Sequence, residues 1–173
     1  MRAVAAFVLL LSAAAVAAAT VSAREQTVAC QAEEATIVGT AGSDILLGTP
    51  EDDVMAGLGG DDRIDGAGGS DRLCGGPGGD RMTGGAADDK LTGGSGADAL
   101  YGGAGGDFVS GGRGRDELDG GLDGDHLQGG RERDLLWGGA GNDNLDGGAA
   151  RDRCNGQAGA DSGKRCERST SIP

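Results

Sequence analysis

An aliphatic residue returns at every ninth position along most of the chain, with polar or small residues between. Twelve consecutive members are Leu, Ile, Met or Val, and Cys154 and Gly163 follow them in phase. The twelve are Leu46, Met55, Ile64, Leu73, Met82, Leu91, Leu100, Val109, Leu118, Leu127, Leu136 and Leu145. A nine-residue period leaves no continuous helix face, because a helix repeats every 3.6 residues. The pattern instead predicts short strands, each with its central side chain facing inward and its two neighbours facing outward.

Glycine and aspartate keep the same phase as the aliphatic residues. Fourteen units of nine run from Gly39 to Lys164 without insertion, with Gly first and Asp sixth in every unit. Glycine suits turns that need positive φ or close backbone approach. Each unit therefore reads as six turn residues and three strand residues. Two units make a coil of 18 residues, and the array makes about seven coils.

The unit resembles G-G-x-G-x-D-x-U-x, the calcium-binding nonapeptide of the RTX (hemolysin-type) repeat family, and the chain is similar to small exported bacterial members. The resemblance implies an all-β fold, a right-handed parallel β-roll. It also implies Ca²⁺ ions between stacked loops, held by aspartate side chains and loop carbonyls. The candidate metal ligands are Asp44, Asp53, Asp62, Asp71, Asp80, Asp89, Asp98, Asp107, Asp116, Asp125, Asp134, Asp143 and Asp152.

Charge makes a cation necessary to this arrangement. The chain has 28 acidic and 15 basic residues and a formal net charge of −13. Stacking places each loop over the loop two units away, where two carboxylates about 5 Å apart repel by ~0.8 kcal/mol even in water. Calcium prefers six to eight oxygen ligands. Two columns of seven loops leave room for at most about twelve ions. The acidic charge also disfavours nucleic acid and anionic lipid as partners.

Several loops depart from the full motif. The fourth position lacks glycine in five units, which predicts a strained or different backbone in those loops: Glu51, Ala87, Asp123, Glu132 and Ala150. The second position is Thr, Leu or Ala in the first four units, which we expect to matter less. Residue Gly163 occupies a core position, so we expect the stack to end there.

The two ends of the chain differ from the array. Residues 1–23 contain Arg2, an apolar run and a small-residue cleavage site at Ala23, which predicts a Sec-type signal peptide and a secreted, extracellular protein. Residues 24–38 are expected to form an N-terminal cap segment, residues 39–164 the roll, and residues 165–173 a C-terminal cap and tail. No later segment is apolar enough to insert into a membrane.

The four cysteines suggest two disulfides in an exported chain, and three pairings are possible. We favour Cys154–Cys166, which closes a short loop, and Cys30–Cys74, which would pin the N-terminal segment. Free thiols are the alternative.

The sequence offers no catalytic constellation. The one histidine, His126, occupies an outward position, and G-x-S-x-G is absent. We therefore expect a non-enzyme, an extracellular calcium-binding structural module. The alternative is a calcium-dependent adhesin or matrix-interaction protein, whose protein or surface partner the sequence does not identify.

Overall fold

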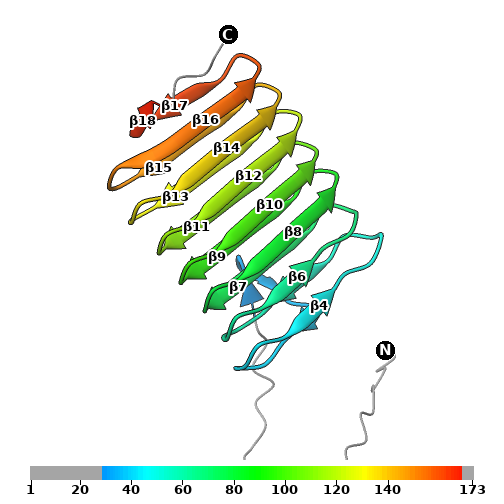
Figure 1. The fold of residues 1–173 in the computed structure, drawn as a ribbon. Helices are drawn as coiled ribbons and strands as arrows, with labels where there is room; N and C mark the ends of the chain where they lie inside the picture. Colours follow the sequence, from blue (N-terminus) through cyan, green and yellow to red (C-terminus); the bar gives the residue numbers. More distant parts are fainter. Residues whose placement is uncertain (1–28, 169–173) are drawn as a thin grey trace, which may run out of the picture.

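The computed structural model describes residues 29–168, and within them the chain is a stack of flattened coils made of two facing parallel sheets (Figure 1). The predicted signal peptide at residues 1–23 lies outside the described residues. Each sheet has eight strands, and consecutive strands of the chain alternate between the sheets. The predicted all-β parallel β-roll of about seven coils is confirmed. The part of the chain described contains no helix that could cross a membrane.

One sheet contains the odd-numbered strands from β3 onward, and the other contains the even-numbered strands from β4 onward. The first sheet consists of β3 (Ile37–Val38), β5 (Val54–Ala56), β7 (Arg72–Pro77), β9 (Lys90–Ser95), β11 (Phe108–Arg113), β13 (His126–Gly130), β15 (Asn144–Gly148) and β17 (Ser162–Lys164). The second consists of β4 (Ile45–Leu47), β6 (Arg63–Asp65), β8 (Arg81–Ala86), β10 (Ala99–Ala104), β12 (Glu117–Leu122), β14 (Leu135–Ala140), β16 (Asp152–Ala158) and β18 (Cys166–Arg168).

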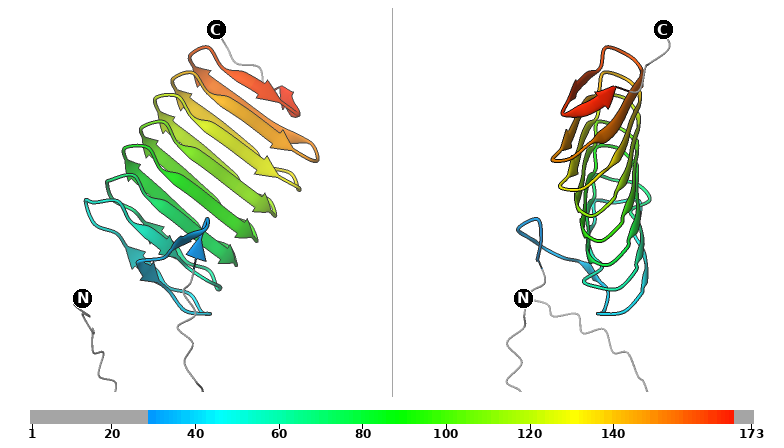
Figure 2. Two further views of the ribbon diagram at one scale, coloured as in Figure 1. Left: turned by 180° about the vertical axis from the view of Figure 1, so that it is seen from behind. Right: turned by 60° about the vertical axis from the view of Figure 1, so that its left-hand side comes forward.

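The core is the predicted column of aliphatic residues. Eleven of the twelve, from Met55 to Leu145, are at most 2% exposed, and they form one cluster with Cys154. Leu46, in the first coil, is only partly buried against that cluster. The edge-on view in Figure 2 shows how narrow the space between the sheets is. One inward side chain per strand fills it, so the nine-residue period fixes the packing.

The strands are longer than the sequence predicts. From β7 to β16 they have five to seven residues instead of three. The second glycine of a unit pairs with those of the coils on either side, as in Gly103↔Gly121 and Gly103↔Gly85. A residue without a side chain lets the backbones stay in register through the start of each bend, so only about three residues form the turn itself.

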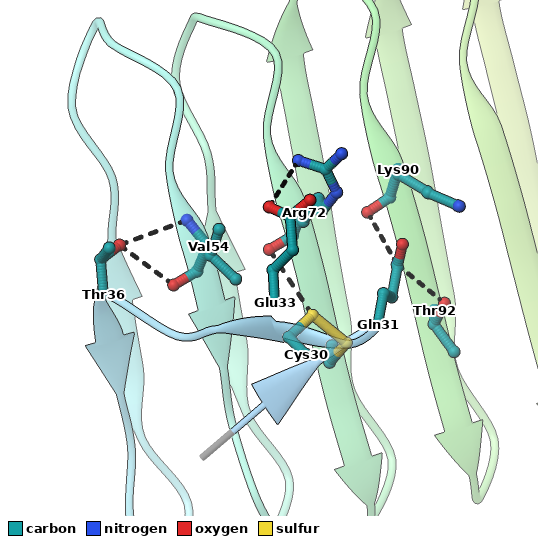
Figure 3. The surroundings of a disulfide bond; sticks show 9 residues. Cys30, Gln31, Glu33, Thr36, Val54, Arg72, Lys90 and Thr92 are labelled. Atoms are coloured by element: carbon teal, nitrogen blue, oxygen red, sulfur yellow. Dashed lines mark hydrogen bonds and ion pairs between the residues drawn. A yellow bond between two sulfur atoms is a disulfide. The ribbon is translucent and has the colours of Figure 1, made fainter. Parts of the chain in front are cut away.

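The N-terminal segment forms a hairpin on the outer face of the odd-numbered sheet (Figure 3). Strands β1 (Ala29–Cys30) and β2 (Glu33–Glu34) are antiparallel, and the predicted disulfide Cys30–Cys74 joins them to β7. Gln31 donates hydrogen bonds to the carbonyl of Lys90 and to Thr92 Oγ1. Cys74 occupies an outward position, so the disulfide holds the hairpin against the sheet face rather than over the end of the core.

The C-terminal end continues one strand beyond the predicted stop. Strand β18 pairs with β16 in the register Asp152↔Cys166, a separation of 14 residues in place of 18. The expectation that the stack ends at Gly163 is therefore wrong by one short coil. The predicted disulfide Cys154–Cys166 closes this last coil and places Cys166 against the core.

Candidate metal centre

The repeated aspartates form two columns, one along each edge of the roll. Each aspartate immediately precedes a strand or opens it, and its partners lie 18 residues before and after it. In each column the backbone N–H of one aspartate donates to Oδ1 of the next, at 2.8 to 3.1 Å from Asp44 to Asp143. The predicted stacking of loop on loop is present, and it buries the carboxylates inside the bends.

The second carboxylate oxygen is unsatisfied in most of these aspartates. Twelve of the aspartates, from Asp53 to Asp152, are at most 8% exposed. Eleven of them have a buried Oδ2 that accepts no hydrogen bond from the described residues: Asp62, Asp71, Asp80, Asp89, Asp98, Asp107, Asp116, Asp125, Asp134, Asp143 and Asp152. A buried charged oxygen without a partner is strongly unfavourable. A repeating row of them is suited to a row of cations.

A main-chain carbonyl of the next coil lies near each of these oxygens at the first glycine of the unit. A Cβ added to Gly102, the first residue of its unit, would overlap both Asp107 Oδ2 and the carbonyl oxygen of Gly120 in the next coil. The same relation recurs along both edges, for example at Gly93 with Asp98 and the carbonyl of Gly111. Glycine at this position therefore leaves a small space into which a carboxylate and a carbonyl both point. Oxygen donors of these two kinds are the ligands of calcium.

The electrostatics of the columns agree with this arrangement. Burial raises the pKa of Asp98, Asp107 and Asp134 to about 7, with further increases from neighbouring aspartates and a partial offset from the backbone hydrogen bond. Burial likewise raises the pKa of Asp89 and Asp125 to about 6. Without an ion these carboxylates are therefore harder to ionise than a free aspartate, and a bound cation would offset that cost.

No cluster of three or more His, Cys, Asp or Glu side chains suited to a metal occurs between residues 29 and 168. Side chains alone thus do not complete a site. An ion in these loops would depend on two stacked aspartates together with loop carbonyls, and the residues present fit a calcium ion bound in that way.

The first two loops differ from the others in a way that sequence reasoning missed. Thr40 donates to Asp44 Oδ2 through its backbone N–H at 2.6 Å and its hydroxyl at 2.9 Å. Thr49 makes the same two bonds to Asp53 Oδ2, at 2.7 and 2.9 Å. These carboxylates are satisfied by the protein. The signal was present in the sequence, since threonine replaces the second glycine in only these two units.

The predicted strain at the fourth loop position is present in part. Ala87, Asp123 and Ala150 have positive φ values of 78°, 73° and 125°. Glu51 and Glu132 do not appear among the residues with positive φ, so these two loops take the different backbone that was the other possibility.

The second loop position can require a positive φ, as the fourth can, whereas we expected the loss of glycine there to matter less. Leu58 and Ala67 have φ of 81° and 75° there. Positive φ is unfavourable for residues with a side chain, so these loops carry backbone strain at the very bend that surrounds the carboxylate.

Comparison with known families agrees with the geometry. A family model described as the RTX calcium-binding nonapeptide repeat (4 copies) matches residues 38–73, 75–109, 93–127, 101–136, 119–154 and 128–162. No curated protein matches the chain. The family matches cover more than half of the 173 residues and coincide with the coils that contain the unsatisfied aspartates. The chain belongs to the family of RTX calcium-binding nonapeptide repeat proteins.

Proposed function

We propose that this protein is an extracellular structural module that calcium ions fold and stiffen. The observation that carries the proposal is the row of eleven buried, unsatisfied Oδ2 atoms. Each ion would neutralise two stacked carboxylates and so convert the repulsion along each edge into attraction. Calcium binding would make the rod stiff, and it would not serve a chemical reaction.

The ligands would be consecutive aspartates of one column together with carbonyls of the loops between them. One column contains six unsatisfied aspartates, from Asp62 to Asp152, and the other contains five, from Asp71 to Asp143. Five and four gaps between neighbours leave places for nine ions, within the limit of twelve expected from the loop count. Asp44 and Asp53, which their threonines satisfy, would bind calcium weakly if at all.

Calcium suits these sites better than magnesium or zinc. Calcium accepts irregular sets of carboxylate and carbonyl oxygens, whereas magnesium needs a near-ideal octahedron and retains its waters. Structural zinc sites use sulfur and nitrogen. All four cysteines are in disulfides, and the single histidine, His126, is exposed on β13 and contacts Asn144.

The two disulfides support an exported location for this protein. Two disulfides are typical of proteins that mature outside the reducing cytosol. Extracellular calcium sites have affinities of about 10⁻⁴ to 10⁻³ M. We propose that residues 1–23 direct export, that residues 24–38 and 165–173 flank the roll, and that the mature protein folds only on meeting millimolar calcium.

The test is a calcium titration of the mature chain, followed by circular dichroism and calorimetry at pH 7.5. We expect little β signal in chelator, a cooperative rise with calcium, reversal by chelator, and about nine ions bound. Magnesium at the same concentration should give little response. A full β signal in chelator, or folding with no calcium bound, would refute the proposal.

A further inference from the structure

The loops of the roll contain a basic cluster on one edge that calcium binding does not explain. Within the first six positions of the fourteen units, the basic residues are five arginines, and all five lie in units nine, eleven and thirteen. We call Arg113, Arg115, Arg131, Arg133 and Arg151 the arginine edge. It is unexpected in a chain whose formal net charge is −13.

The topology stacks these three loops directly. They connect β11 to β12, β13 to β14 and β15 to β16, which places them at the same edge of the roll, on the lower left side in Figure 1. Neighbouring strands of a sheet lie ~4.8 Å apart. The guanidinium groups therefore form a ladder that runs parallel to the long axis of the roll.

The ladder faces solvent. All five arginines are exposed. Within the part of the chain that the structure describes, no carboxylate forms an ion pair with Arg113, Arg115, Arg131 or Arg133. Glu132, which lies among them, directs a carboxylate oxygen to the backbone N–H of Gly114 instead.

The opposite edge has the reverse charge. Its loops contain no basic residue, and they add Glu51, Asp52, Asp88 and Asp123, all of them exposed. The two edges of the roll are therefore chemically distinct, although both carry the same column of buried aspartates.

We propose that the arginine edge binds a linear anionic polysaccharide, with its sulfate or carboxylate groups along the ladder. An extended row of evenly spaced guanidiniums fits an extended polymer better than a small anion, because the loops form an open edge and enclose nothing. Arginine presents a planar fork that matches sulfate and carboxylate groups.

Other polyanions fit this edge less well. The loops at residues 111–116, 129–134 and 147–152 contain no aromatic residue on which a nucleic acid base could stack. They also contain no large apolar residue that could enter a membrane interface. Binding here would be electrostatic and parallel to the rod.

Calcium should strengthen this binding, a step that rests on the proposed function. Arg115, Arg133 and Arg151 each precede a buried aspartate of the calcium column, so the ions would lie next to the arginine edge, and calcium would order the loops that contain it. Every ion bound adds two positive charges, and the nine ions proposed above outweigh the net charge of −13. The loaded rod would then present a cationic edge.

The experiment measures binding of the mature chain to dextran sulfate by calorimetry, in 2 mM calcium at low and moderate salt. The test variant is R113Q/R115Q/R131Q/R133Q. The matched control is R63Q/R81Q/K90Q/K164Q, which removes the same charge from the sheet faces and the C-terminal coil. We expect the test variant to lose roughly tenfold or more in affinity and the salt dependence to flatten. The control should lose much less, and both should keep the calcium-induced β signal.

Four outcomes would overturn the inference. The first is equal affinity of the test variant and the wild type for dextran sulfate, and the second is an equal loss of affinity in the control. The third is tighter binding to duplex DNA or phosphatidylserine vesicles than to dextran sulfate. The fourth is salt-sensitive self-association that the test variant abolishes. The last would identify a second copy's acidic edge as the occupant. Failure of the calcium proposal gives a different result, because dextran sulfate would then bind equally with and without calcium.

Discussion

Replacing one central aspartate by asparagine should destabilise the calcium-loaded protein, although it removes a buried charge. Asp107 Oδ1 accepts the N–H of Asp89 at 2.8 Å, and its Oδ2 lies beside the Gly120 carbonyl without a hydrogen-bond donor. In Asp107→Asn, the amide oxygen can keep the first bond, and the amide nitrogen can donate to the carbonyl. The substitution therefore preserves shape and removes only the anionic ligand.

The sign of the change in the free energy of unfolding shows whether or not Asp107 binds calcium. Without ions, relieving a buried unpaired charge should stabilise the fold by about 1–3 kcal/mol. With ions, Asp107 serves the sites above and below it in its column. At a calcium concentration ten times the dissociation constant each site contributes ~1.4 kcal/mol. Losing both sites costs ~3 kcal/mol, and relief of the buried charge offsets about 1–3 kcal/mol of that, so the net loss of stability should be at most ~2 kcal/mol.

The assay is urea unfolding in 2 mM calcium, followed by circular dichroism, with ion counting by calorimetry. The control is Asp88→Asn, an exposed neighbour that accepts the Gly106 N–H through Oδ1 at 2.9 Å and undergoes the same change of charge. We expect Asp107→Asn to unfold at lower urea with up to two ions fewer, and the control to change little. A more stable Asp107→Asn protein with an unchanged ion count would refute the reasoning.

Three further predictions follow from the same contacts. Gly102→Ala places a methyl group against Asp107 Oδ2 and the Gly120 carbonyl, so it should abolish calcium binding in that loop. The control is Gly68→Ala, whose added Cβ would have its nearest neighbour, the Ala86 Cβ, 4.0 Å away. Calorimetry should show that the control binds the normal number of ions. Removing the Cys30–Cys74 disulfide, with its separation of 44 residues, should cost ~4 kcal/mol on the chain-entropy account, measured by urea unfolding against wild type; an unchanged midpoint would contradict this. Because burial raises the pKa of the column aspartates in the folded protein to as much as about 7, the ion-free fold binds more protons than the unfolded chain. Its stability should be greatest below pH 4 and should fall as the pH rises through about 6 to 7, so chelator-treated protein should gain β signal on acidification; a β signal independent of pH would contradict the account.

The nine-residue period predicted most of this fold because it assigns every residue of the array to a strand, the core or a bend. The alternation around Leu100 or Leu118 specifies one inward side chain per strand, and the phase of glycine and aspartate specifies the bend. The strand length was underestimated because a propensity argument assigns glycine to turns. In a stack, the glycines of adjacent coils pair with one another, as Gly103 and Gly121 do.

The candidate site was predicted in composition but not in detail. Sequence spacing brings Asp89 and Asp107 together, yet it does not reveal that Oδ1 binds the backbone while Oδ2 is left without a partner. That division depends on how the carboxylate turns inside the bend. The threonine bonds to Asp44 and Asp53 are local hydrogen bonds, which a repeat consensus conceals.

The ends were the least predictable parts. The pairing of Cys166 with Asp152 shortens the last coil to 14 residues, and no periodic signal specifies it. The position of the N-terminal hairpin could have been inferred from Cys74. This residue is the ninth of its unit, so its side chain faces outward, and its disulfide holds Cys30 on the outer face of the sheet. Where the period stops, tertiary contacts determine the structure.

The most direct measurement is a crystal structure of the protein grown in millimolar calcium, with anomalous scattering used to locate the ions. The account predicts ions between stacked loops along both edges, each within about 2.3–2.6 Å of column Oδ2 atoms and loop carbonyls. It also predicts that the loops of Asp44 and Asp53, bonded to their threonines, bind calcium least. A well-ordered roll whose column carboxylates contact no ion would contradict the account.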